Sequence, residues 1–113
     1  LVSPGMAKQL IYTARNIKAD EAYRIGLVNA VYPLEELMPA AKKMAAGIAM
    51  QAPIAVRNCK KAINEGLQVS IDKAVEIEEK LFGDCFETED QKYGMAFFLD
   101  KNKEKVKEPF KNC

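Results

Sequence analysis

The side chains able to carry acid–base chemistry in this sequence are carboxylates, lysines, tyrosines and cysteines, because the chain contains no histidine. That absence removes Ser-His-Asp and Cys-His nucleophilic sites in their usual forms, together with the commonest transition-metal ligand. Cys59, Cys85 and Cys113 are widely spaced, so they indicate neither a zinc site nor a disulfide framework. The glycines stand singly, which leaves no glycine-rich loop for a phosphate.

Adjacent carboxylates occur at Asp20–Glu21, Glu78–Glu79 and Glu89–Asp90. We interpret the first and last pairs as solvated helix faces or favourable charges in a first helical turn. Glu78 differs, because helical periodicity places it on the inward face between Val75 and Phe82. A buried carboxylate needs a partner, so we expect Glu78 to lie inside and to pair with Arg57, Lys61 or another cation. The functional alternative is a general base with a raised pKa.

The last part of the chain is locally basic and carries aromatic residues. The residues concerned are Lys101, Lys103, Lys105, Lys107 and Lys111, with Phe97, Phe98 and Phe110 among them. A solvated, frayed terminus is one interpretation of such a tail. The other is a contact with an anionic nucleotide, in which a ring stacks on a base and a lysine meets a phosphate.

The elements that must position these side chains are helices. Apolar spacing predicts helices over residues 6–14, 19–25, 34–50, 53–65, 70–86 and 88–99. Their boundaries rest on Gly26 as a C-cap, Pro53 in a first turn, Ser70 as an N-cap, and Thr88 with Gln91 as a capping box. Residues 27–31 are the one run with strand-like composition, and this run is too short to form a sheet. The fold class predicted is all-α, an irregular bundle of about six helices.

Composition is that of one small globular region. Of the 113 residues, 49% are hydrophobic and 29% are charged, which argues against disorder. The charges of the 17 basic and 16 acidic residues nearly cancel, so the net charge does not favour binding to nucleic acid or to an anionic membrane. The longest uncharged stretch, Met44 to Val56, is too short to span a bilayer. The odd cysteine count favours a cytoplasmic location, and Leu1 in place of an initiator Met suggests a piece of a longer protein.

Several strings in this order resemble the crotonase (enoyl-CoA hydratase/isomerase) superfamily. They are ADEA at 19–22, RIGLVN at 24–29, APIAV at 52–56, CFETEDQK at 85–92 and PFK at 109–111. Within that superfamily the sequence is most similar to short-chain 3-hydroxybutyryl-CoA dehydratases. The chain departs from the family pattern at Ala14, where many members carry Gly, at Tyr93, where an acid is usual, and at Asn102, where a basic residue is common.

The resemblance implies that residues 1–113 are the helical C-terminal region of a larger enzyme, mediating trimer contacts and capping an acyl-CoA site. The spiral core, with its oxyanion hole and paired glutamates, would lie upstream, so no catalytic residue is assigned here. Phe98 and Lys101 match the tail aromatic and lysine that lie near the CoA nucleotide in the family. The resemblance implies no cofactor, since the substrate itself carries coenzyme A.

Two hypotheses follow for function. The first is the C-terminal part of an enoyl-CoA hydratase-type lyase that forms homo-oligomers and is inactive as an isolated segment. The second is a stand-alone helical module for oligomerisation or protein interaction, without catalysis. The mass of the natural polypeptide separates the two.

Overall fold

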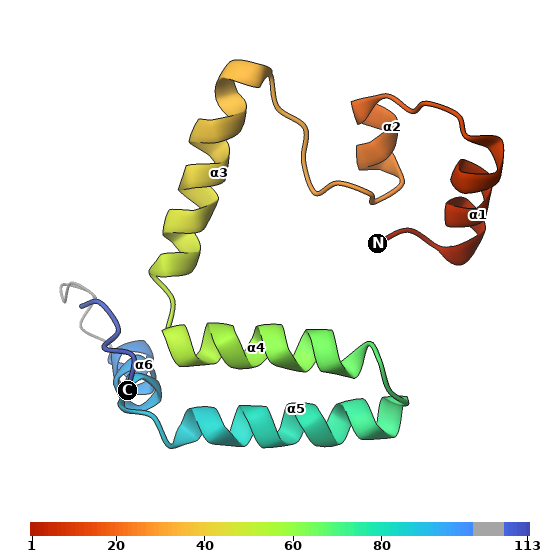
Figure 1. Cartoon of the computed structure of the whole chain (residues 1–113). Helices are drawn as coiled ribbons and strands as arrows, with labels where there is room; N and C mark the ends of the chain where they lie inside the picture. Colours follow the sequence, from red (N-terminus) through yellow and green to blue (C-terminus); the bar gives the residue numbers. More distant parts are fainter. Residues whose placement is uncertain (101–107) are drawn as a thin grey trace. The chain divides into compact units, whose positions relative to one another are not determined.

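The computed structural model describes residues 1–100 and 108–113, and every regular element in these ranges is an α-helix (Figure 1). The helices are α1 (Pro4–Thr13), α2 (Ala19–Arg24), α3 (Leu34–Ala49), α4 (Pro53–Gly66), α5 (Ile71–Phe86) and α6 (Glu89–Leu99). The all-α prediction is therefore confirmed. Residues 27–31, which we expected to be extended, form no strand, because a strand requires a ladder partner and the described residues supply none.

Local signals set the ends of α1 and α2. Ser3 caps α1 by accepting a hydrogen bond from the Met6 N–H at 3.3 Å, and Pro4 occupies the first turn. Gly26, at φ +77°, follows α2, and the Leu27 N–H donates to the Ala22 carbonyl at 2.9 Å. This 6→1 hydrogen bond across a left-handed glycine is a Schellman motif, so the expected C-cap role of Gly26 is confirmed.

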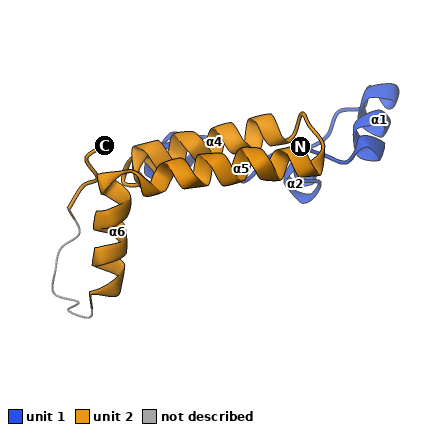
Figure 2. Cartoon of the chain, turned by 90° about the horizontal axis from the view of Figure 1, so that it is seen from below, with its two compact units in different colours: residues 1–43 blue, residues 44–113 orange. Residues whose placement is uncertain are grey.

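The chain divides into two compact units, residues 1–43 and residues 44–113 (Figure 2). The first unit contains α1 and α2, and Ala22 is its buried apolar residue. The boundary between the units falls within α3, which contains Pro39. The helix predicted over residues 34–50 is confirmed as α3, which begins at Leu34 and includes Pro39. A proline there lacks the N–H that the Glu35 carbonyl would otherwise accept.

In the second unit, α4 and α5 lie side by side as an antiparallel hairpin (Figure 1). Gly66 permits a close approach where the hairpin turns, since a Cβ on this residue would lie 3.4 Å from the Ala74 Cβ. Further along, the Asn58 side-chain amide of α4 donates to the Leu81 carbonyl of α5 at 3.0 Å. The Leu81 side chain is itself buried, so this hydrogen bond between α4 and α5 lies beside an apolar contact.

The inward face of α5 differs from the one we predicted. Val75 and Phe82, expected on the inward face, are 44% and 65% exposed, whereas Leu81 is 7% exposed. Ala22 and Leu81 are the only buried apolar side chains among the described residues. Large apolar side chains of α3 are likewise open to solvent, Leu34 and Met38 included. Many large apolar side chains of the described helices are therefore exposed.

Candidate functional site

The first turn of α6 is built around Thr88. Its side-chain oxygen accepts from the Gln91 N–H at 3.1 Å, which confirms the N-cap. The reciprocal half of a capping box is not made, because the Thr88 N–H bonds to the Cys85 carbonyl at 3.2 Å instead. The Thr88 hydroxyl also donates to that carbonyl at 2.7 Å. The end of α5 and the start of α6 are therefore held by one threonine.

Asp90, two residues after this cap, holds the C-terminal tail, here defined as residues 108–113. Its carboxylate accepts the backbone N–H groups of Lys111 at 2.6 Å and Asn112 at 2.8 Å. The Asp90 N–H in turn donates to the Cys113 carbonyl at 3.2 Å. Asn112 lies at φ 64°, a left-handed conformation that Asn adopts more readily than most residues, and this bend turns consecutive N–H groups toward one carboxylate.

Asp90 is 3% exposed, so our interpretation of the Glu89–Asp90 pair as solvated is wrong for this residue. It holds for Glu89, which forms an exposed ion pair with Lys92 at 2.6 Å. Sequence reasoning missed Asp90 because its partners lie 21 and 22 residues away, where helical periodicity carries no information. The resemblance to the family over residues 85–92 was the one feature of the sequence that could have drawn attention to Asp90.

Aromatic rings reinforce the same contact. The Tyr93 ring packs edge-on against Phe110 of the tail, with ring centroids 6.0 Å apart, and lies 6.2 Å from Phe97. The Tyr93 hydroxyl accepts the Glu108 N–H at 2.7 Å. A second anchor joins the tail to α4, since the Arg57 guanidinium donates to the Asn112 side chain at 2.9 Å. Arg57, one of the partners expected for Glu78, is thus bound to the tail.

Phe98 stands apart from this cluster. Its side chain is 81% exposed, whereas Phe97, one residue earlier on α6, is half-buried. An exposed ring one residue before the end of a helix is available to stack on a ligand. Lys101, the residue expected to act with Phe98, lies outside the described residues. Their joint contact with a nucleotide stays a prediction.

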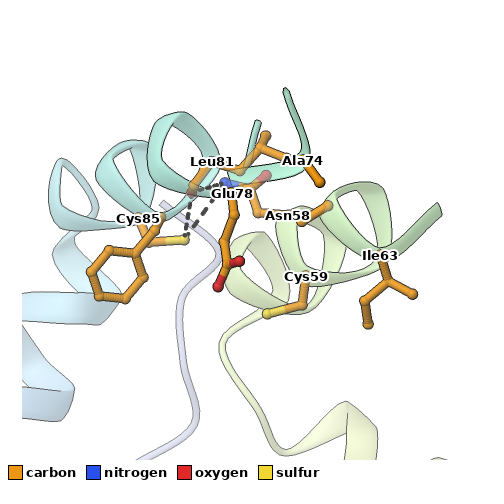
Figure 3. A pocket seen from close by; sticks show the side chains of 9 residues that line it. Asn58, Cys59, Ile63, Ala74, Glu78, Leu81 and Cys85 are labelled. Atoms are coloured by element: carbon orange, nitrogen blue, oxygen red, sulfur yellow. Dashed lines mark hydrogen bonds between the residues drawn. The ribbon is translucent and has the colours of Figure 1, made fainter. Parts of the chain in front are cut away.

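Glu78 lies on a groove between α4 and α5, and it is exposed rather than buried. The groove has a volume of about 360 Å³ and a mainly apolar lining. The lining residues are Asn58, Cys59, Ala62, Ile63, Ala74, Glu78, Leu81, Phe82 and Cys85. Figure 3 shows the Glu78 carboxylate on the same side of the hairpin as Cys59 and Ile63.

The expected partner of Glu78 is absent: within the described residues no cation reaches its carboxylate, and Lys61 pairs with Glu65 at 3.9 Å. The prediction of a buried, paired Glu78 is therefore wrong for this chain. Periodicity placed Glu78 between Val75 and Phe82, and the structure places it on the groove beside Leu81 and Phe82. Periodicity could not show that the facing surface is open.

In the first unit, Glu21 is the carboxylate with the most contacts. Arg15 donates to both of its oxygens, at 3.1 and 2.6 Å, and Arg24 approaches to 3.7 Å. The hydrogen bond from Arg15 lowers the pKa of the Glu21 carboxyl, partly opposed by desolvation and assisted by the two positive charges. The same hydrogen bond raises the pKa of Arg15. Both side chains are partly solvent-accessible, so we interpret this pair as structural.

The described residues contain no metal cluster, no disulfide and no membrane-spanning helix. No group of acidic, histidine or cysteine side chains there could hold a metal ion. The cysteines Cys59, Cys85 and Cys113 are all free thiols. None of the helices in the described ranges has both the length and the apolar character needed to cross a bilayer. One carboxylate, Glu78, lines the groove, and no second acid accompanies it there.

Comparison with known proteins identifies related sequences over nearly the whole chain. The profile of the family described as enoyl-CoA hydratase/isomerase matches residues 2–110. A crotonyl-CoA hydratase of Syntrophomonas wolfei is 58% identical over 103 residues, which are 91% of this chain and 40% of that protein. A short-chain-enoyl-CoA hydratase of Clostridium acetobutylicum is 57% identical over the same shares of the two chains.

Solved structures agree with these sequence relatives. The crystal structure of an enoyl-CoA hydratase from Bacillus anthracis superposes with a TM-score of 0.90 at 38% identity, covering 100% of this chain and 42% of that one. A second, from Geobacillus kaustophilus, gives a TM-score of 0.85 at 34% identity, with 95% and 42% coverage. The chain thus spans about 40% of the length of these two hydratases of Syntrophomonas wolfei and Clostridium acetobutylicum.

Proposed function

The chain belongs to the enoyl-CoA hydratase/isomerase family, and from this premise we propose that it is the C-terminal part of an enoyl-CoA hydratase. The parent enzyme would add water reversibly to a trans-2-enoyl-CoA thioester, which in the reverse direction makes it a 3-hydroxyacyl-CoA dehydratase. The 58% identity to a relative named crotonyl-CoA hydratase carries this proposal and favours a short acyl chain.

Within that enzyme the segment supplies binding and assembly surfaces, and the catalytic groups come from elsewhere. Adding water to an enoyl thioester needs a positioned base, a positioned acid and donors that stabilise the enolate oxygen. The described residues offer Glu78 alone on the groove, and the sequence offers no histidine. We therefore expect the isolated segment to be inactive.

The α6 end is the part of the segment that we assign to the acyl-CoA site. Phe98 presents a ring that is 81% exposed, and an exposed aromatic ring can stack on an adenine base. Lys101 follows by three residues in the sequence and would neutralise a phosphate of the nucleotide. Coenzyme A enters as part of the substrate, so the proposal includes no separate cofactor.

Homo-oligomer formation is part of the same proposal. Large apolar side chains are exposed on several helices, among them Leu34, Met38, Ile63 and Phe82. Surface of this kind in a folded protein ordinarily meets another surface, either the rest of the polypeptide or a sister subunit. We propose a trimer, or a dimer of trimers, located in the cytoplasm.

The test is the hydration of crotonyl-CoA by the parent protein, followed by the loss of ultraviolet absorbance of the conjugated thioester. We expect turnover by the parent and none above the buffer rate by residues 1–113 alone. A parent that does not hydrate crotonyl-CoA or a longer enoyl-CoA would overturn the proposal. A natural polypeptide no longer than this chain would favour the stand-alone helical module.

A further inference from the structure

The C-terminal tail joins α6 to α4, and Asn112 is the residue that makes both connections. Its backbone N–H donates to the Asp90 carboxylate of α6 at 2.8 Å, and its side-chain oxygen accepts from the Arg57 guanidinium of α4 at 2.9 Å. Hydrogen bonds with one charged partner are stronger than neutral ones, and both of these are of that kind. We call the three residues Arg57, Asn112 and Asp90 the brace.

The brace lies at the junction where α6 leaves the α4–α5 hairpin. Figure 2 shows α6 running away from the end of the hairpin, with the C-terminus of the chain beside the junction. Phe98 follows Asp90 by eight residues, which places it about 12 Å further along the helix axis at 1.5 Å per residue. Over that length, a tilt of about 10° at Asp90 would move the Phe98 ring by about 2 Å. A small change at the brace is therefore amplified at Phe98.

We propose that Arg57, Asn112 and Asp90 are positioning residues for the nucleotide end of acyl-CoA, because they fix the direction of α6 and with it the place of the Phe98 ring. The inference rests on the proposed function, in which Phe98 stacks on the adenine base. A helix that is held in its binding position before the substrate arrives loses less freedom on binding. Releasing the brace should therefore weaken substrate binding without touching the reacting groups.

The backbone of Asn112 allows the two halves of the brace to be separated experimentally. Asn112 lies at φ 64°, and in this conformation its N–H and that of Lys111 both reach the Asp90 carboxylate. Glycine adopts a left-handed conformation without steric strain. Asn112→Gly therefore keeps the backbone contact with Asp90 and removes the side-chain link to Arg57.

Steady-state kinetics of the full-length parent enzyme test the brace. Asn112→Gly and Arg57→Ala should each raise KM for crotonyl-CoA about threefold, a modest effect because the Arg57 hydrogen bond is exposed to solvent. The value of kcat should stay nearly unchanged, since the nucleotide is remote from the reacting carbons and a contact there acts as uniform binding. Neither variant should change KM for the crotonyl thioester of pantetheine, which lacks the nucleotide.

Lys61→Ala is the matched control, because Lys61 is another exposed cation of α4 and pairs with Glu65 outside the brace. It should leave KM for crotonyl-CoA unchanged. Unchanged KM in both brace variants, or an equal rise with the pantetheine substrate, would overturn the inference. A fall in kcat at constant KM would also overturn it, because the brace would then support the fold or the catalytic core and not the nucleotide contact.

A double variant shows whether the brace acts through Phe98. Phe98→Ala alone should raise KM for crotonyl-CoA about fivefold, and adding Asn112→Gly should cause no further rise, since residues that act through one contact are not additive. A further threefold rise in the double variant would overturn the inference. If Phe98→Ala leaves KM unchanged, the assignment of α6 to the acyl-CoA site fails, and this inference fails with it. If Phe98→Ala raises KM and the brace variants do not, this inference alone fails.

Discussion

Replacing Asp90 by asparagine in the parent enzyme should release the C-terminal tail while leaving the helices folded. The carboxylate accepts two backbone N–H groups, at 2.6 and 2.8 Å, and is 3% exposed. Hydrogen bonds to a charged acceptor contribute about 1.5 to 3 kcal/mol each. Asparagine keeps the shape, but it offers one acceptor oxygen and turns an NH₂ group toward the second N–H, so one bond is lost.

The expected loss is about 2 kcal/mol of local stability, since the freed N–H groups of the tail can bond to water. That corresponds to roughly thirtyfold faster amide hydrogen exchange if the tail opens locally. The amides to follow by mass spectrometry or NMR are those of Lys111 and Asn112. Amides in the middle of α5 serve as an internal reference and should keep their protection.

Glu89→Gln is the matched control, because Glu89 is the adjacent carboxylate and forms only an exposed pair with Lys92. A surface pair of this kind contributes between about 0 and 1 kcal/mol, so tail exchange should change less than about fivefold. If the two variants give the same exchange rates for Lys111 and Asn112, Asp90 does not hold the tail. If α5 also loses protection, the tail and the hairpin unfold together and the local magnitude above is wrong.

Three further predictions concern the parent enzyme. Lys101→Ala should raise KM for acyl-CoA about fivefold with kcat nearly unchanged, because an exposed ammonium–phosphate contact contributes about 1 kcal/mol of uniform binding. An equal rise in KM for a pantetheine thioester, which lacks the adenosine phosphate, would contradict this role. Ala14→Gly should stabilise by about 0.5 to 1 kcal/mol in urea unfolding, since Ala14 lies at φ 48°. The pKa of the Glu21 carboxyl is lowered in the folded state, so the carboxylate stabilises the fold above its unfolded pKa, and this stabilisation is lost as pH falls through the folded pKa. NMR titration of Arg15→Gln should show that the pKa of Glu21 returns to its ordinary value.

Features that depend on a few neighbouring residues were predictable from the sequence. The Gly26 end of α2, the Pro53 start of α4 and the Thr88 cap of α6 are each encoded within one turn of the chain. Capping residues and left-handed glycines act through local backbone geometry, so they end or begin a helix in the same way whatever the surrounding fold. Ser70 shows the limit of this reasoning, since it occupies the N-cap of α5 without making the side-chain hydrogen bond.

Contacts between distant parts of the chain were not predictable in the same way. Asp90 and Glu89 are neighbours in one first helical turn, and the same rule favours both carboxylates there. Only the return of the tail to the start of α6 makes one of them a buried acceptor and leaves the other in water. The hydrogen bond from Arg57 to Asn112 joins residues that are 55 apart in the sequence, so it also depends on where the tail lies.

The error on α5 has a different physical origin. Two apolar stripes run along this helix, one through Ala74, Leu81 and Cys85 and the other through Ile71, Val75 and Phe82. Periodicity led us to the second stripe, because it recurs at the spacing of a helix face, but periodicity does not identify which surface covers a stripe. The hairpin with α4 covers the first stripe and leaves the second exposed. Glu78 lies where the first stripe meets the open groove, so its burial depends on a surface that the described residues do not supply. An apolar stripe that neither α4 nor α6 covers is therefore best explained by a further surface that packs against α5.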